Sequence, residues 1–231
     1  MERITEVCKV YQQARDNTSK VIVSCTDEKT GIQAIENIKT EAVQKGQCNR
    51  KDSEYKRNGT TCLMASFSVK SGAITHYNLK ESRTEKDFLE HIKGIVSTAP
   101  KADHVIVCDQ LNTHKSESLV IWIAEQTGYE GDLGIKGKEG ILKSMKSRME
   151  FLEDKSHRIR FQYTPKHCSW LNQIENWFGF LQSKVIKNGQ FKSVEMLEEK
   201  IEAFINYYNK NLSKPLKWTF CGKKYLQKLK I

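Results

Sequence analysis

The sequence predicts a mixed α/β domain in which helices flank a central sheet. Two short β-branched runs, KVIVSCT at 20–26 and HVIVCD at 104–109, have the composition of buried strands. Apolar residues at helical spacing lie between and after these runs. This order of strands and interleaved helices favours an α/β architecture, and 231 residues suit one domain with a sizeable core.

The first half of the chain is expected to form strands and one helix. Residues 62–69 alternate large and small side chains, as a half-buried strand does, and residues 74–79 supply its hairpin partner. Thr84 has the character of a helix N-cap, and the apolar stripe that follows it ends at Pro100.

The second half is expected to be mainly helical, apart from one strand. Glycine recurs between residues 128 and 140 without the period of collagen, which indicates a mobile loop. The expected helices cover 115–126, 141–153, 170–187 and 193–209, and the expected strand covers 158–163.

The net charge of +10 is confined to the last third of the chain. Residues 155–231 contain 15 basic and 5 acidic residues, whereas residues 1–154 contain 23 of each. This asymmetry suggests a polyanionic partner on the C-terminal part. A lysine-rich surface that only keeps the protein soluble is the alternative, so the charge favours nucleic acid only modestly.

Several classes of protein are not supported. The seven cysteines include no C-x-x-C pair, which argues against a disulfide framework and a zinc knuckle. No signal peptide or membrane-length apolar run is present, so a cytoplasmic protein without membrane contact is expected. The absence of a P-loop, a dinucleotide fingerprint and a Ser-His-Asp pattern argues against a small-molecule substrate.

Three carboxylates are candidates for chemistry. Asp27 and Asp109 each follow a β-branched run, which predicts that both lie at strand ends, where a parallel sheet opens its site. Glu175 lies in a predicted helix with Leu171 and Phe178 at i−4 and i+3, so we expect it to face the protein. A salt bridge and a metal site are equally open for this glutamate. Three converging carboxylates would suit two-metal phosphoryl transfer with Mg²⁺.

Four segments carry a family resemblance. They read DEKTGIQA (27–34), EYKRNGT (54–60), VIVCDQLNTHKS (105–116) and TPKHCSWLNQIENWF (164–178). They resemble the successive motifs of bacterial insertion-sequence transposases, within the DDE superfamily of endonucleases and its mariner-related branch. Residues 188–209 and 214–224 are similar to the closing part of that family. The resemblance therefore covers nearly the whole chain.

The resemblance implies a ribonuclease H-like fold with Asp27, Asp109 and Glu175 as catalytic residues and ligands of two Mg²⁺ ions, for which Mn²⁺ can substitute. It implies a DNA endonuclease and strand transferase that acts in cut-and-paste DNA transposition. The expected partners are double-stranded DNA, as transposon ends and target, and a second copy of the chain in a homodimer. A location on the nucleoid follows when DNA is bound.

Other residues near these motifs have two readings each. Asn112 and His114 either steady the site through hydrogen bonds or only make contacts at a helix start. His167 is a candidate for facing phosphate, Asn172 is a weaker DNA-facing or positioning candidate, and Ser169 is expected to cap the following helix. Trp170 and Trp177 are expected in the core, and Glu28 is taken as a polar neighbour without an assigned role.

The chain departs from the family pattern in three places. Gln110 stands where the family usually has asparagine, and the interval from Asp109 to Glu175 is 66 positions, which is longer than usual. The extra residues, about 128–157, form a Gly-rich and helical insertion before the last catalytic helix. This insertion either contacts DNA or a partner subunit or is a surface addition, which we slightly favour.

The third departure concerns the N-terminal region. Residues 1–20 are too short for the helix-turn-helix domain that reads the element's ends, so they are expected to be a residual linker to a missing DNA-recognition region. Residues 21–231 are then the DDE catalytic domain. A second hypothesis is a non-catalytic DNA-binding or partner-binding remnant that modulates an intact transposase, and a ribonuclease or junction nuclease is a weaker third.

Overall fold

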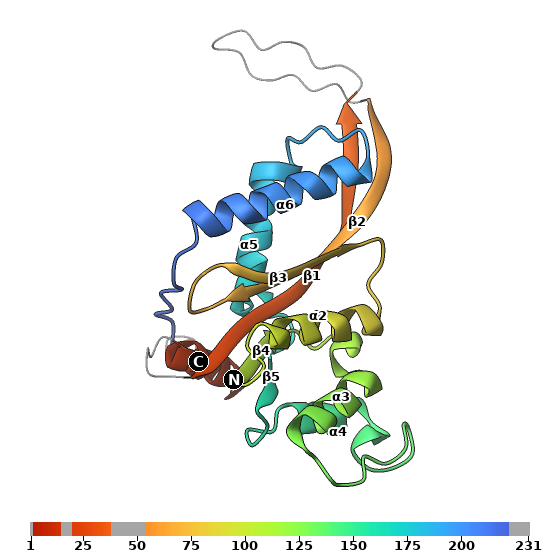
Figure 1. The fold of residues 1–231 in the computed structure, drawn as a ribbon, viewed down its shortest axis with the longest axis vertical. Coiled ribbons are helices and arrows are strands. Elements are labelled where there is room, and N and C mark those ends of the chain that lie inside the picture. The colour runs from red at the N-terminus through yellow and green to blue at the C-terminus, as the bar shows by residue number, and fades with distance from the viewer. Residues whose placement is uncertain (1, 15–19, 38–53, 222–231) are drawn as a thin grey trace, which may run out of the picture.

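A computed structural model describes residues 2–14, 20–37 and 54–221 of the chain. Five strands form one sheet in the order β3-β2-β1-β4-β5 (Figure 1). The strands are β1 (Val21–Asn37), β2 (Tyr55–Ser68), β3 (Ile74–Lys80), β4 (Asp103–Cys108) and β5 (Ile159–Tyr163). The first three pair antiparallel, and β4 and β5 continue the sheet parallel to β1. This order and these directions confirm the predicted ribonuclease H-like fold.

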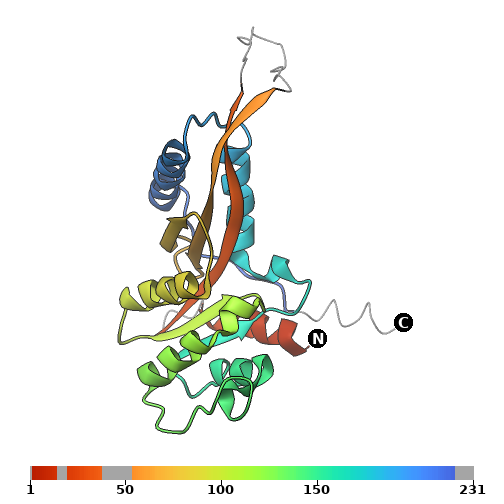
Figure 2. The same ribbon diagram turned by 90° about the vertical axis from the view of Figure 1, so that its right-hand side faces the viewer.

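Helices cover both faces of the sheet. Helices α1 and α5 lie on one side of β1, and α2 and α3 lie on the other (Figure 2). The helices are α1 (Glu2–Ala14), α2 (Glu85–Ser97), α3 (Glu117–Thr127), α4 (Met145–Leu152), α5 (Gln173–Leu181) and α6 (Val194–Asn211). Short 3₁₀ turns are η1 (Asn112–Lys115), η2 (Ile141–Lys143) and η3 (Ser169–Leu171), and a π-helical turn, η4 (Gln182–Ile186), follows α5.

Strand β4 shows how the sequence builds the two cores. Val105 and Val107 belong to the core beneath α1 and α5, whereas Ile106 and Cys108 belong to the core beneath α2 and α3. Successive side chains of a strand point to opposite faces, so a continuous apolar run is expected where both faces are covered.

Thr84 caps α2 as predicted, because its side chain accepts a hydrogen bond from the Asp87 backbone N–H.

Strand β1 is longer than the sequence suggested. Asp27 does not end a strand, because β1 continues to Asn37 through its pairing with β2, where Asp27 lies opposite Ala65. The parallel pairing of β1 with β4 stops earlier, at Cys25 opposite Val107. Asp27 therefore lies just beyond the end of the parallel half of the sheet, and only the prediction of a strand end is wrong.

Helix α1 lies within the stretch expected as a linker, and it packs into the core. Val7 and Tyr11 are fully buried, and Tyr11 Oη donates a 2.6 Å hydrogen bond to the carbonyl of Leu171, two residues before α5. At the other end of α1, Arg3 forms an ion pair with Glu153. The domain boundary at residue 20 stays a prediction. None of the helices in the described ranges is both long and apolar enough to cross a bilayer.

The hydrogen bond of Tyr11 gives a test of the role of α1. We expect Tyr11→Phe to lower the free energy of unfolding by about 1–2 kcal/mol, because the buried Leu171 carbonyl loses its 2.6 Å donor and keeps only the longer bond from Gln173 Nε2, at 3.4 Å. Tyr207→Phe is the matched control, since Tyr207 is 55% exposed on α6. Urea unfolding of both variants measures the difference, and equal unfolding curves would contradict a structural role for the Tyr11 hydroxyl.

Candidate active site

The three candidate carboxylates come from three elements that lie against one another. Asp27 is in β1, Asp109 directly follows the neighbouring parallel strand β4, and Glu175 is in the first turn of α5, which packs on β1. The charge of Asp109 contributes to raising the pKa of both Asp27 and Glu175, after the larger effect of burial. The three side chains therefore share one electrostatic environment.

Asp27 is buried, and its carboxylate is held by hydrogen bonds from two amides. One carboxylate oxygen accepts a 2.8 Å hydrogen bond from the Glu28 backbone N–H, and the other accepts a 3.1 Å bond from Asn172 Nδ2. Burial, followed by the repulsion of Asp109, raises the pKa of Asp27 to about 7. In the part of the chain that the structure describes, Asp27 forms no ion pair with a Lys, Arg or His side chain. A buried carboxylate in this state has a high affinity for a cation.

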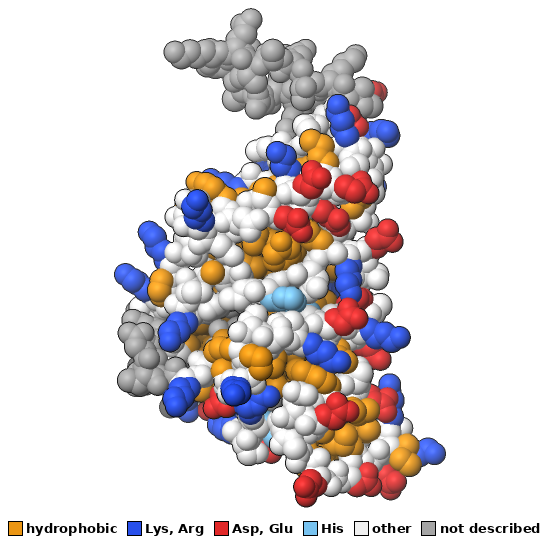
Figure 3. Space-filling model, in the orientation of Figure 1, with side chains coloured by type: hydrophobic (Ala, Val, Ile, Leu, Met, Phe, Trp, Pro, Cys, Tyr) orange, Lys and Arg blue, Asp and Glu red, His pale blue; other side chains and the backbone are white. Residues whose placement is uncertain are grey.

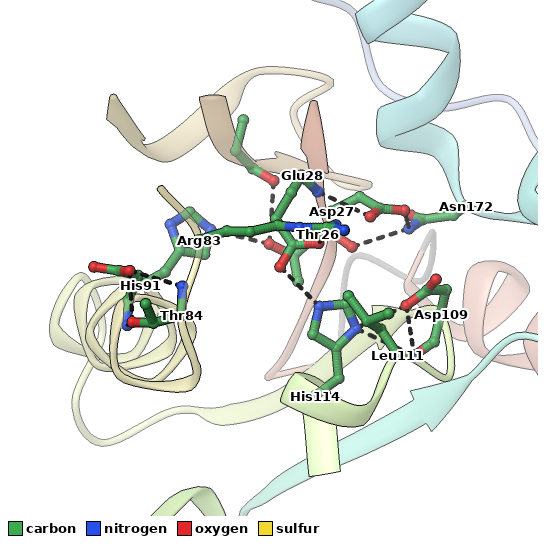
Figure 4. Close-up of polar contacts among 12 residues, drawn as sticks. Thr26, Asp27, Glu28, Arg83, Thr84, His91, Asp109, Leu111, His114 and Asn172 are labelled. Atoms are coloured by element: carbon green, nitrogen blue, oxygen red, sulfur yellow. Dashed lines mark hydrogen bonds and ion pairs between the residues drawn. The ribbon is translucent and has the colours of Figure 1, made fainter. Parts of the chain in front are cut away.

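Asn172 holds Asp27 from the start of α5. Its side chain is fully buried, and Nδ2 also donates to the backbone carbonyl of Thr26 at 2.9 Å. It is the N-cap residue of α5 but forms no capping bond with its side chain. The amide is therefore directed at β1 (Figure 4). Ser169 lies in the preceding 3₁₀ turn, so the expectation that it caps the helix is wrong.

His114 joins two carboxylates from distant parts of the sequence. Nε2 lies 3.0 Å from Glu28 Oε1, and Nδ1 lies 2.8 Å from Asp109 Oδ1 (Figure 4). The ring is fully buried and stacks on Phe88 with centroids 4.1 Å apart. Burial alone would lower the pKa of His114, but its hydrogen bonds to Asp109, Cys108 and Glu28 raise it well above 6.5. Burial likewise raises the pKa of Asp109, yet the hydrogen bond and charge of His114 lower it below 3.8.

Glu28 has a role that the sequence did not reveal. Its side chain is only 2% exposed and contacts His114, with Arg83 Nη1 3.9 Å from its other oxygen. Asp27 and Glu28 are consecutive in a strand, so they point to opposite faces of the sheet. Asp27 meets α5 on one face, and Glu28 meets η1 on the other. The period of two in a strand could have predicted that Glu28 faces away from Asp27, but not that it contacts His114.

Glu175 and Trp170 differ from expectation. Glu175 is exposed rather than directed at the protein, because α5 begins only at Gln173 and Leu171 is not a helical neighbour. Burial still raises its pKa, and the charge of Lys29 lowers it. Trp177 is in the core as predicted, with 3% exposure, whereas Trp170 is 41% exposed beside the site.

The remaining candidates lie on the two loops that border the site. Asn112 is exposed at the start of η1. His167 is also exposed and has a positive φ of 60°, a backbone conformation that is strained for this residue type. Gln110 Nε2 donates to the Thr164 carbonyl at 2.9 Å and so ties these two loops together.

The site offers donor atoms of the kind that a divalent metal prefers, but these donors are not yet arranged around one position. Within the described residues, no group of three His, Cys, Asp or Glu side chains is already arranged to hold a metal ion. The available donors are carboxylate oxygens, which hard cations such as Mg²⁺ prefer. Asn172 adds a buried side-chain oxygen, Oδ1, that has no hydrogen-bond partner among the described residues. A cation would also offset the mutual repulsion of Asp27 and Asp109.

Comparison with known proteins gives one family match and several similar solved structures. The DDE superfamily endonuclease family matches residues 22–198. Among solved structures, the catalytic domain of Mos1 mariner transposase is similar, with 10% identity, 89% of this chain and 80% of that chain covered, and a TM-score of 0.49. The Mos1 mariner paired end complex with Mn has 13% identity, 92% and 63% coverage and a TM-score of 0.36. The Mos1 strand transfer complex has 13% identity, 92% and 62% coverage and a TM-score of 0.34.

No curated protein matches the sequence. The family match nevertheless spans all three candidate carboxylates and well over half of the chain. The chain belongs to the DDE superfamily of endonucleases.

Proposed function

We propose that this chain is the catalytic domain of a transposase, a metal-dependent DNA endonuclease and strand transferase. The observation that carries the proposal is the buried Asp27, which has no cation partner in the described residues and lies in the field of Asp109. Asp27, Asp109 and Glu175 would hold two Mg²⁺ ions, or Mn²⁺ in their place. The bound metal would supply an activated oxygen nucleophile and stabilise the leaving 3′ oxygen.

The chain's own residues would orient these carboxylates. Asn172 donates a hydrogen bond to one oxygen of Asp27 and so fixes the orientation of that carboxylate. His114 fixes Oδ1 of Asp109 and keeps that carboxyl ionised. Such hydrogen bonds to metal ligands set both their orientation and their basicity.

Basic residues around the carboxylates would bind the phosphate backbone. The charge of Lys29 acts on Glu175, and Lys166 is exposed on the loop before η3. Lys115 is 7% exposed, so its charge acts on Asp109 from within the fold. The face shown in Figure 3 is less suitable over α6, where acidic side chains gather. The sequence of α6 contains four glutamates, Glu195, Glu198, Glu199 and Glu202. The predicted DNA surface on the C-terminal part is therefore proposed at the site and not over α6.

The partners and domain limits follow from the same proposal. Double-stranded DNA, as transposon ends and target on the nucleoid, is the proposed substrate, and a homodimer is the proposed assembly. Residues 21–231 are proposed as the DDE catalytic domain with an insertion at about 128–157. A non-catalytic DNA-binding remnant is the second candidate, since no three ligands converge within the described residues.

Nicking of supercoiled plasmid DNA separates these two functions. We expect nicking with Mg²⁺ or Mn²⁺ but not with EDTA, and a loss of more than about 10³-fold in Asp109→Asn and Glu175→Gln, because each removes a metal ligand. Glu199→Gln is the control, since it removes an exposed carboxylate from α6. Gel-shift affinity for DNA should be unchanged, or slightly higher in Asp109→Asn. DNA binding without metal-dependent nicking would support the remnant instead.

A further inference from the structure

The insertion at 128–157 is part of the domain core. Leu142 and Leu152 are buried in the cluster that includes Ile159 and Tyr163 of β5. Ser144 begins α4 with a capping box, in which its side chain accepts from the Ser147 backbone N–H. The insertion is therefore folded onto the sheet, and the expectation of a mere surface addition is wrong.

Arg148 of α4 is buried in an unusual way. It is 4% exposed and forms no ion pair with a carboxylate of the described residues. Its donors go to two backbone carbonyls. Nε and Nη2 donate to Leu142 O at 3.1 and 3.0 Å, and Nη1 donates to Lys115 O at 3.4 Å. A buried guanidinium is costly unless its donors are used. The bonds to Leu142 anchor the side chain within the insertion, and the bond to Lys115 ties α4 to η1.

The last two carbonyls of η1 are both held from outside the turn. Tyr163 Oη donates to the His114 carbonyl at 2.7 Å, and Arg148 reaches the next carbonyl, that of Lys115. The final carbonyls of a helical turn have no partner within it and must find one elsewhere. The position of η1 is therefore set by β5 on one side and by the insertion on the other.

We propose that the insertion acts as a brace for the active site, with Arg148 as a positioning residue. Arg148 holds the backbone of η1, η1 holds the His114 ring, and the ring holds Glu28 and Asp109 at 3.0 and 2.8 Å. Loss of the brace shifts the ring and with it the carboxylate of Asp109. The effect on cleavage rests on the proposed function, whereas the effect on the His114 ring does not.

Two measurements separate the effect on the His114 ring from the effect on DNA cleavage. Two-bond ¹H–¹⁵N spectra of His-labelled protein report the hydrogen bonds of the His114 ring without any activity, and the rate of plasmid nicking reports the site. The test variants are Arg148→Met, which keeps the apolar stem, and Arg148→Lys, which keeps the charge but cannot reach both carbonyls. Lys146→Met is the control, because the side chain of Lys146 is 82% exposed on the same helix.

We expect Arg148→Met to move the His114 ring signals and to lower the nicking rate by about 10- to 100-fold with unchanged DNA affinity. Arg148→Lys should give smaller changes in the same direction, and Lys146→Met should match the wild type. If Arg148→Met does not fold, Arg148→Lys decides alone. Wild-type His114 signals in a folded Arg148 variant overturn the brace. A wild type that never nicks DNA overturns only the proposed function, because the spectra still test the brace.

Discussion

Asp27→Asn is expected to abolish metal-dependent nicking while making the metal-free protein more stable above pH 7. The loss of cleavage follows from the removal of a proposed metal ligand, and we expect it to exceed about 10³-fold. The gain in stability follows from burial, because an ionised Asp27 is 8% exposed and has no cation partner among the described residues. Folding raises the pKa of Asp27 from 3.8 to about 7, which sets an upper limit of about 4 kcal/mol for the gain in the free energy of unfolding.

The pH dependence has a definite sign. The unfolded chain loses the Asp27 proton near its ordinary pKa of 3.8, whereas the folded chain keeps it until about pH 7. Between these values the folded state binds more protons, so the contribution of Asp27 to stability falls as the pH rises. The substitution Asp27→Asn should therefore raise the free energy of unfolding more at pH 8 than at pH 5.

Thermal melting with EDTA and with Mn²⁺ measures both effects. At pH 8 we expect Mn²⁺ to raise the Tm of the wild type and to leave the Tm of Asp27→Asn nearly unchanged, since ligand binding stabilises only the state that binds. Asp132→Asn is the control, because Asp132 is an exposed carboxylate of the insertion. An equal rise of Tm with Mn²⁺ in wild type and Asp27→Asn would place the metal elsewhere.

His114→Phe is expected to cost about 3–5 kcal/mol of stability at pH 6, because the buried Glu28 carboxylate loses its 3.0 Å partner and keeps only Arg83 at 3.9 Å. The phenyl ring keeps the stacking on Phe88, so the loss is mainly polar. Glu28→Gln in the same chain should recover part of the loss. His157→Phe is the control, since His157 is also buried but its Nδ1 has no hydrogen-bond partner in the described residues.

The same variant tests the ionisation of His114. Its folded pKa lies well above 6.5, so its stabilising effect is complete below pH 6.5 and is lost as the pH rises through the folded value. The difference in unfolding free energy between wild type and His114→Phe should thus be larger at pH 6 than at pH 10. Urea unfolding at both pH values in EDTA measures it. If the difference in unfolding free energy does not depend on pH, His114 is not charged in the folded protein.

The sequence predicted those parts of the fold that depend on local pattern. The β-branched runs gave β4 and the first part of β1, and Thr84 marked the start of α2. The full length of β1 depends on its pairing with β2, so the run at 20–26 alone could not indicate it. The place of α1 could not be seen either, because its contact with Leu171 spans 160 residues.

In the candidate site, too, local sequence predicts some features, whereas others depend on long-range contacts. Strand ends, helical spacing and family motifs point to Asp27, Asp109 and Glu175, and the structure puts these residues on neighbouring elements. The contact between Glu28 and His114 spans 86 residues and has no local signature. The solvent exposure of Glu175 depends on where α5 begins, and helix boundaries are set by tertiary contacts such as that of Asn172 with Thr26.

The adjacent acids of β1, Asp27 and Glu28, also make the site sensitive to the register of the sheet. Since the pleat alternates, a slip of one residue between β1 and β4 would turn Glu28 towards Asn172 and Asp27 towards His114. The longer side chain would then crowd Asn172 at the start of α5, and the shorter one would fall short of the imidazole. Correct alignment of the central strands and correct assembly of the site are therefore the same event during folding.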